Sequence, residues 1–317
     1  MYKTIFFFLL LLPLISFSQR INNQISYRDM NSDAYMRLSY DNDYFTGTDK
    51  YYTQGINLEV VSNSLRKNPL NFLLLRRDDK YTKYGIAVDH FGFTPTSIRS
   101  SEILQGDRPF AGNLSLKSFN VVYDAERNNI YTSSITLGVI GSRAGGEWMQ
   151  TTIHEAIGDQ LPIGWQFQIA NDVIINYEVA VEKRLYTYYD SFLFNVSAGA
   201  NAGTLSDKVH GGFNFRLGKL KPEIINEKTK GLQFYIFCES LVNAIGYDAT
   251  MQGGVFNRSS PYTIAAKDIK RLTFQQNFGV VLNFRKIYLE YFQSLLTPEF
   301  RGEKMHRWGG IKIGVKL

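Results

Sequence analysis

Oxygen-bearing side chains concentrate in two neighbouring segments near the start of the chain. The first, Tyr40-Asp-Asn-Asp-Tyr-Phe45, places carboxylate and amide oxygens at the end of an expected strand. Asn42 and Asp43 therefore offer the hard oxygen ligands that Ca²⁺ prefers. In the segment that follows, Thr53 could add a hydroxyl or backbone oxygen to the same cation. Read alone, each segment is better explained as a turn that Asp and Asn open.

A histidine lies in the one segment that breaks the strand pattern. Residues 147–157 lack period-two alternation, contain good helix formers and are bracketed by glycines, which predicts a short helix. Gln150 and His154 fall one turn apart on the same side of it. A neutral imidazole can remove a proton from water near neutral pH, so His154 is the candidate general base for ester hydrolysis. Gln150, or Asp159 or Gln160 just after the helix, could orient the ring or complete a metal shell; a structural role for a lone histidine is the alternative.

Two arginines lie upstream of this helix. In Gly106-Asp-Arg-Pro-Phe-Ala-Gly112, Asp107 and Arg108 could form a local ion pair that fixes a loop, which favours a structural role over a catalytic one. Arg99 is a candidate oxyanion donor, because a guanidinium stabilises charge that develops on a carbonyl oxygen. An exposed Arg99 with no catalytic role fits the sequence equally well.

The elements that must position these residues are β-strands. Near the end of the chain, Ile311, Ile313 and Val315 share one face while Lys312 and Lys316 share the other, which suits lipid on one side and a polar lumen on the other. Similar segments recur, and an even number suits a closed bacterial barrel. The expected strands cover residues 35–43, 52–63, 83–92, 111–123, 129–141, 170–185, 191–203, 211–218, 231–247, 270–284, 286–295 and 307–317.

Alternating strands also build soluble sandwiches and lipocalin-like barrels, so the export signal matters. Residues 1–18 carry a Lys before an apolar run and then small residues, which predicts a signal peptide cleaved near Ser18–Gln19. Together with the many Phe and Tyr residues available for interfacial girdles, this favours a single all-β domain over residues 19–317, a transmembrane antiparallel barrel of about twelve strands.

Composition and short motifs limit the classes of molecule that the chain could bind and the activities that can be assigned to it. The formal charge of +6 is scattered along the chain, which argues against nucleic acid and is compatible with an anionic membrane glycolipid. The single cysteine, Cys238, excludes an intramolecular disulfide. The sequence also lacks a nucleophile elbow, a His-Glu-x-x-His zinc motif, a P-loop and a dinucleotide fingerprint, so no common catalytic motif assigns an activity.

Taken in order, several segments resemble the lipid A 3′-O-deacylase family of outer-membrane proteins. The resemblance covers the N-terminal half of the mature chain. It is carried by Asn42-Asp43, Tyr52-Thr-Gln-Gly55, Gly106-Asp-Arg-Pro-Phe-Ala-Gly112, Leu137-Gly-Val-Ile-Gly141, Gly145-Gly-Glu-Trp-Met-Gln-Thr-Thr-Ile-His-Glu-Ala-Ile-Gly158 and Gly164-Trp-Gln-Phe-Gln168.

The resemblance implies a twelve-stranded barrel with its site near the outer rim and Ca²⁺-dependent hydrolysis of the 3′-linked acyl group of lipid A, the anchor of lipopolysaccharide. It maps the active-site Asn-Asp pair onto Asn42 and Asp43, the Thr onto Thr53 and the catalytic His onto His154, with Asp43 as a cation ligand. Where a functional Glu is expected after the helix, this chain has Asp159 and Gln160.

Two other functions remain open at this stage. One is an outer-membrane phospholipase, which uses a Ser nucleophile with His and Asn, although no well-placed Ser accompanies His154. The other is a non-enzymatic pore or structural barrel in which the helix at 147–157 only plugs the lumen.

Overall fold

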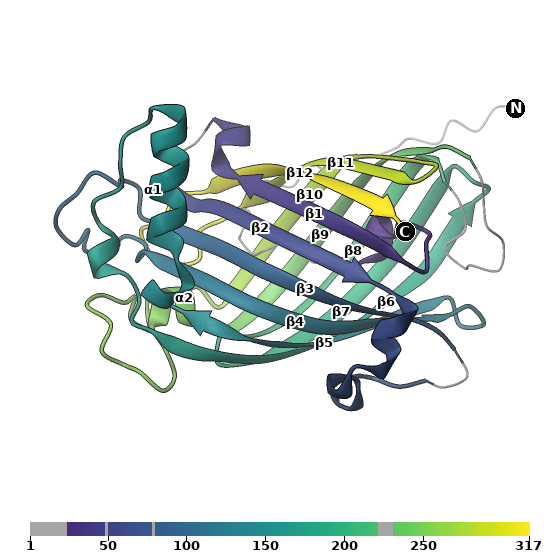
Figure 1. The fold of residues 1–317 in the computed structure, drawn as a ribbon, viewed down its shortest axis with the longest axis horizontal. Helices are drawn as coiled ribbons and strands as arrows, with labels where there is room; N and C mark the ends of the chain where they lie inside the picture. The colour runs from purple at the N-terminus through teal and green to yellow at the C-terminus, as the bar shows by residue number, and fades with distance from the viewer. Residues whose placement is uncertain (1–23, 48–49, 78–79, 221–230) are drawn as a thin grey trace, which may run out of the picture.

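The structure is a computed structural model that describes residues 24–47, 50–77, 80–220 and 231–317. The predicted signal peptide, residues 1–18, lies outside the described residues. The described chain is an antiparallel barrel closed by pairing of its first and last strands (Figure 1). This confirms the predicted fold class.

Twelve strands form the barrel, as the alternation predicts, and most begin and end within a few residues of the expected bounds. The strands are β1 (Tyr35–Asn42), β2 (Tyr51–Val61), β3 (Tyr81–Thr94), β4 (Ala111–Asp124), β5 (Asn129–Ile140), β6 (Asp172–Tyr188), β7 (Phe192–Gly203), β8 (Ser206–Lys219), β9 (Gln233–Asp248), β10 (Leu272–Phe284), β11 (Ile287–Leu296) and β12 (His306–Lys316).

Each strand separates an apolar outer face from a polar inner face. On β1, Met36 and Leu38 are exposed outside while Arg37, Ser39 and Asp41 are buried inside. An exposed apolar face around a buried polar interior is the pattern of a membrane barrel and the reverse of a soluble one. No helix in the described part of the chain is long and apolar enough to cross a membrane.

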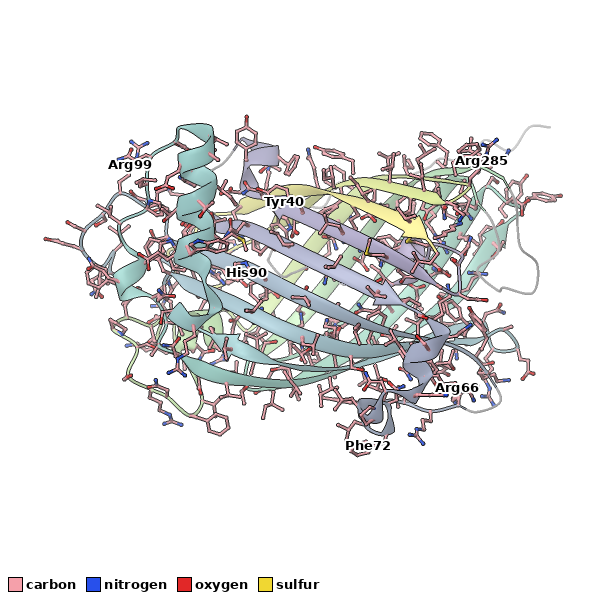
Figure 2. The ribbon with its side chains drawn as sticks, viewed as in Figure 1. Tyr40, Arg66, Phe72, His90, Arg99 and Arg285 are labelled. Atoms are coloured by element: carbon pink, nitrogen blue, oxygen red, sulfur yellow. The ribbon has the colours of Figure 1, made fainter. Side chains whose placement is uncertain are left out.

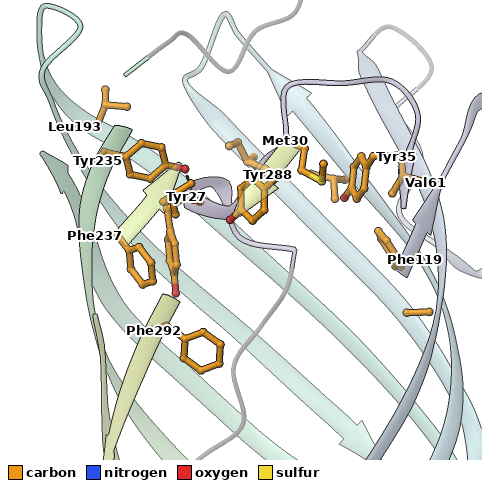
Figure 3. Close-up of a cluster of buried hydrophobic side chains, with 14 of the residues drawn as sticks. Tyr27, Met30, Tyr35, Val61, Phe119, Leu193, Tyr235, Phe237, Tyr288 and Phe292 are labelled. Atoms are coloured by element: carbon orange, nitrogen blue, oxygen red, sulfur yellow. Dashed lines mark hydrogen bonds between the residues drawn. The ribbon is translucent and has the colours of Figure 1, made fainter. Parts of the chain in front are cut away.

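The lumen is filled with side chains at the end of the barrel where the two ends of the described chain lie. Around the 3-10 helix η1 (Ser26–Arg28), the N-terminal segment enters the barrel, and Tyr27 and Met30 pack among strand residues (Figure 3). The Arg28 guanidinium pairs with Glu290 at 2.8 Å, and the Tyr27 hydroxyl donates to Glu239 at 2.7 Å. Pairing of this kind offsets the cost of burying charged groups inside the barrel.

The longer connections gather mainly at the opposite end, called here the rim. The connection after β5 holds α1 (Gly146–Ile157), which begins one residue before the predicted helix and ends where predicted (Figure 1). The shorter helices are η2 (Asp43–Thr46), η3 (Asn63–Lys67), η4 (Pro69–Leu73), η5 (Ser142–Ala144), η6 (Trp165–Phe167) and α2 (Ala249–Gln252).

Arg108 joins three rim connections, but not through the expected ion pair. The carboxylate of Asp107 accepts from the backbone N–H of Arg108 at 2.8 Å and from that of Thr96. The buried guanidinium instead pairs with Glu299 and donates to the Thr250 hydroxyl at 2.9 Å. The predicted ion pair between Asp107 and Arg108 is therefore wrong, but Arg108 does have a structural role in the loops.

Prediction: the cluster formed by Arg108, Glu299 and Thr250 becomes less stable as pH rises. Burial, opposed by Arg108, raises the pKa of Glu299 from 4.5 to about 7. The folded state therefore holds this proton more tightly than the unfolded chain, and the cluster loses stability as pH rises from about 4.5 to about 7. The protection factors of amides in the rim connections, which correct for the intrinsic pH dependence of exchange, should be lower at about pH 8 than at about pH 5.5. Glu299→Gln should reduce that difference, whereas the exposed Glu102→Gln should not; equal protection of the parent protein at both pH values would contradict the prediction.

Candidate active site on the outer wall of the barrel

Helix α1 packs against the outside of the barrel wall. Asp89 and Phe91 on β3 and Ser115 on β4 line a cavity inside the lumen. By strand alternation, His90 between the first two and Gly112, three residues before Ser115, face outward. The Nε2 atom of His90 lies 3.0 Å from the carbonyl oxygen of Ala144, directly before the helix. A Cβ on Gly112 would lie 3.3 Å from the Cα of Gly146, the first residue of α1. The helix therefore does not plug the lumen. A site formed by this helix lies on the outer face of the barrel.

A β-bulge turns Thr53 toward this helix. In the pairing of β2 with β3, Tyr52 opposes Phe93 and Gln54 opposes Gly92, which leaves Thr53 as the extra residue. A bulge of this kind re-aims one side chain out of the regular alternation. The methyl group of Thr53 lies over Gly92 on the outer face, and its hydroxyl accepts from the side chain of Gln150 on α1 at 3.0 Å.

A chain of hydrogen bonds links β1, β2, α1 and the connection after α1. The Asn42 amide donates to the Thr53 carbonyl oxygen at 2.5 Å, and Asn42 also contacts Tyr40, labelled in Figure 2, on the outer face of β1. Gln150 donates to Thr53 and accepts from the indole N–H of Trp165 at 2.7 Å. The structure thus brings together three of the predicted residues, Asn42, Thr53 and Gln150.

Trp165 supports the site, a role that the sequence did not assign to it. Its ring packs on Phe110, with centroids 5.1 Å apart, and a Cβ on Gly146 would lie 2.6 Å from it. Glycine at 146 is therefore required for α1 to approach this ring. The sequence did hold a hint of this role, because Phe110, Gly146 and Trp165 all belong to the segments that carry the family resemblance. Their spacing, however, does not show that the three residues are in contact.

His154 lies one turn after Gln150 and is 8% exposed. Its Nδ1 atom lies 2.6 Å from the backbone carbonyl oxygen of Gln160. A carbonyl only accepts, so Nδ1 carries the proton in the neutral ring and the lone pair belongs to Nε2. Asp159 places a carboxylate oxygen 3.9 Å from Nδ1. Gln160 thus orients the ring through its backbone, and Asp159 supplies a nearby negative charge.

The oxygen donors around Asp43 fit a hard cation. Asp43 is buried at the start of η2, where its carboxylate accepts from the Lys50 backbone N–H at 2.6 Å. The preceding residue, Asn42, carries an amide oxygen and donates to the carbonyl oxygen of Thr53, so carboxylate, amide and hydroxyl oxygens of the kind that Ca²⁺ prefers lie at the adjoining ends of β1 and β2. Among the described residues, no group of three or more His, Cys, Asp or Glu side chains could hold a metal. The contacts of Asp159 lie with Gln160 and His154, at the C-terminal end of α1.

Arg99 is not part of this hydrogen-bonded chain. Its side chain is exposed and projects outward beside α1 (Figure 2). Its neighbour Ile98 accepts a backbone hydrogen bond from Ile163 at 3.0 Å, so Arg99 borders the connection that follows the helix. Within the described residues, no hydrogen bond joins its guanidinium to His154 or Gln150.

Comparisons with known proteins agree with this architecture. LpxR from Salmonella typhimurium has a similar structure, with a TM-score of 0.74 at 19% sequence identity over 89% of this chain and 100% of that one. The β domain of the Bordetella autotransporter BrkA is more distant, with a TM-score of 0.45 at 8% identity over 90% of this chain and 100% of that one. No curated protein sequence matches the chain. The profile of the family described as outer membrane protein LpxR matches residues 5–317, so the chain belongs to this family, which confirms the resemblance of its motifs.

Proposed function

We propose that the protein is a hydrolase that releases the ester-linked 3′-acyl or acyloxyacyl chain of lipid A by attack of a water activated by His154. Membership of the LpxR family supports an outer-membrane enzyme that modifies lipid A. The ester bond is what the resemblance of the motifs implies, and the role of His154 is inferred from that resemblance together with the geometry of the site.

The observation that carries this proposal is the position of the site on the outer wall at the rim. Two residues along β4 from Gly112, where α1 packs, the outward side chains of Leu114 and Leu116 begin the exposed apolar surface. A lipid whose acyl chains lie against that surface presents its ester groups at the level where α1, the helix that carries His154, packs on the wall. A substrate that passed through the lumen would not reach this face.

In the proposed mechanism, Nε2 of His154 takes a proton from water as the water oxygen attacks the ester carbonyl. The imidazolium that forms is stabilised by the Gln160 carbonyl oxygen and by the carboxylate of Asp159. It then returns the proton to the departing sugar oxygen. Asn42 and Gln150 hold α1 in register with the barrel, so that His154 stays fixed relative to the wall.

A bound Ca²⁺ would polarise the ester carbonyl and stabilise the developing oxyanion. Asp43 would be its charged ligand, with Thr53 offering a neutral oxygen. Asp159, a candidate ligand from the sequence, serves His154 in this proposal and not the cation. Arg99, which borders the connection after α1, is a candidate second donor to the oxyanion.

The two alternatives have less support. A phospholipase of the serine type needs a Ser hydroxyl on His154, whereas the ring contacts found in the described residues are with Gln160 and Asp159. A pore needs an open lumen, but Tyr27, Arg28 and Met30 pack inside one end of this barrel.

Prediction: His154→Ala removes the base and lowers the rate of deacylation by about a hundredfold or more. Folded protein in detergent is incubated with lipid A, and mass spectrometry follows the loss of one 3′-linked acyl or acyloxyacyl unit. His210→Ala, which changes a lumen residue, should retain activity. Intact lipid A with cleaved phospholipid would favour a phospholipase, and no product from either lipid would refute the proposed activity.

Prediction: Gln150→Leu breaks the hydrogen bonds to Thr53 and Trp165 and lowers kcat by about tenfold or more with little change in KM. The emission of Trp165 should also shift, because its indole N–H loses its acceptor. Gln166→Leu, the same change at an exposed neighbour, should affect neither. An unchanged kcat in a folded Gln150→Leu protein would show that the hydrogen-bonded chain does not position the base.

Prediction: a Ca²⁺ chelator abolishes activity, and Asp43→Asn raises the Ca²⁺ concentration that gives half of the maximal rate by about tenfold or more. Asp159→Asn should lower kcat without changing the Ca²⁺ requirement, since Asp159 contacts His154. A raised requirement in Asp159→Asn would make that residue a ligand instead. Asp190→Asn, at the opposite end of the barrel, is the control; full activity in excess chelator would exclude the metal.

A further inference from the structure

The connection between β2 and β3, which holds η3 and η4, lies on the outside of the barrel wall at the end opposite the rim (Figure 1). Asn68 of this connection donates to the Ser118 hydroxyl of β4 at 3.1 Å. The backbone of Leu75 accepts from the Asn120 side chain of β4 at 2.6 Å and donates to the Ser133 hydroxyl of β5 at 2.9 Å. Polar groups of the wall therefore hold the connection in place.

The connection covers the wall directly beside the apolar belt. On β4, Leu114 and Leu116 are exposed on the outer face, and Ser118 and Asn120 continue that face by strand alternation. Ser118 and Asn120 are nevertheless only 3% and 1% exposed, because the connection lies over them. The step from Leu116 to Ser118 is about 7 Å along the strand. The connection is thus continuous with the surface that faces lipid.

Three apolar side chains of this connection are exposed. Phe72 is 67% exposed and projects away from the barrel (Figure 2), and Leu73 and Leu75 are each 38% exposed, whereas Leu74 between them is buried. An apolar face beside the hydrocarbon core of a membrane, on a segment that lies along the surface, is the pattern of an interfacial segment. Because the belt adjoins it, these side chains reach lipid.

Cations accompany the apolar side chains. Arg66 and Lys67, in the last turn of η3, are exposed, and in the part of the chain that the structure describes neither forms an ion pair. The carboxylate of Asp124 on β4 is already paired with Arg77 at 2.8 Å, and the acidic residues at 78–79 lie outside the described residues. Basic residues beside an apolar segment at a membrane surface attract anionic head groups.

The length of this connection is unusual for the end of the barrel at which it lies. Bacterial barrels have short turns at the periplasmic end and longer loops at the outer end. Two other turns at this end, residues 125–128 and 285–286, are short, whereas the connection between β2 and β3 covers residues 62–80. The longer connections otherwise gather mainly at the rim, so this one lies in the periplasmic leaflet, opposite the candidate site.

We propose that residues 63–75 bind anionic phospholipid of the periplasmic leaflet. Phe72, Leu73 and Leu75 lie among the acyl chains, and Arg66 and Lys67 contact the phosphate groups, to which guanidinium and ammonium groups donate charge-assisted hydrogen bonds. The inference does not depend on the proposed hydrolysis, because the segment and the candidate site lie at opposite ends of the barrel.

Fluorescence quenching tests whether the segment lies in lipid. Phe72→Trp protein is reconstituted in vesicles of phosphatidylcholine and phosphatidylglycerol with brominated acyl chains, which quench indoles that they touch. Both leaflets have the same composition, so the orientation of the barrel does not matter. The parent protein gives the signal of the three native tryptophans. Phe91→Trp, the same change beside the lumen cavity, is the matched control.

The indole added by Phe72→Trp should lose most of its emission in brominated lipid, and the one added by Phe91→Trp should lose little. Emission of Phe72→Trp that brominated lipid does not reduce would overturn the proposal. A blue-shifted spectrum would then show that protein covers the segment, either a second copy or a partner, and a red-shifted spectrum would show that water does.

Vesicles in which only one of the two lipids is brominated test the cations. From the quenching of Phe72→Trp we expect about a tenfold preference for phosphatidylglycerol over phosphatidylcholine, which shrinks at high salt. Adding Arg66→Gln and Lys67→Gln should remove most of this preference. Adding Arg285→Gln and Lys286→Gln instead, in a turn at the same end, removes the same charge and should leave it. A preference that survives the first pair of changes, or that both pairs reduce equally, would overturn the proposed head-group site.

Discussion

Closure of the β-sheet is the constraint from which the site follows. A strand edge in lipid would leave backbone N–H and C=O groups without partners, at a cost of about several kcal/mol for each group. Here β1 pairs with β12 from Tyr35 opposite Lys316 to Asn42 opposite Gly309, so no edge remains. Because Asn42 is the last paired residue, the chain leaves the wall at that level, and Asp43 begins a turn over the outer face. The pairing that seals the barrel also sets the height of the site.

A polar site on the lipid-facing side of a barrel needs its polar groups paired. Asn42, Thr53, Gln150 and Trp165 satisfy one another in a single hydrogen-bonded chain, and all but Asn42 are nearly fully buried. Unpaired polar groups would be costly there, because water is scarce beside the apolar belt. This series of hydrogen bonds therefore avoids the cost of burying unpaired polar groups. It also fixes the helix that carries His154.

The strands and the helix were predictable because both have a local signature. Period-two alternation located twelve strands, and its interruption located α1. The surroundings of the site could not be predicted, because they depend on contacts between residues that are distant in the sequence. Arg108, for example, pairs with Glu299, 191 residues away, and not with its neighbour Asp107. Likewise, spacing could align Gln150 with His154 on one helix, but not show that α1 packs outside the wall or that Trp165 lies beneath it.

The segment from Gly106 to Gly112 explains why the rim and the site belong to one structure. Arg108 holds two other rim connections through Glu299 and Thr250. Two residues later Phe110 packs on Trp165, and two residues after that Gly112 lies against the first residue of α1. A displacement of this short segment would therefore reach both the loop cluster and the support of His154. The buried ion pair thus acts on the site through packing rather than through its charge, since the contacts of the Arg108 guanidinium among the described residues are with Glu299 and Thr250 of the loops and not with His154.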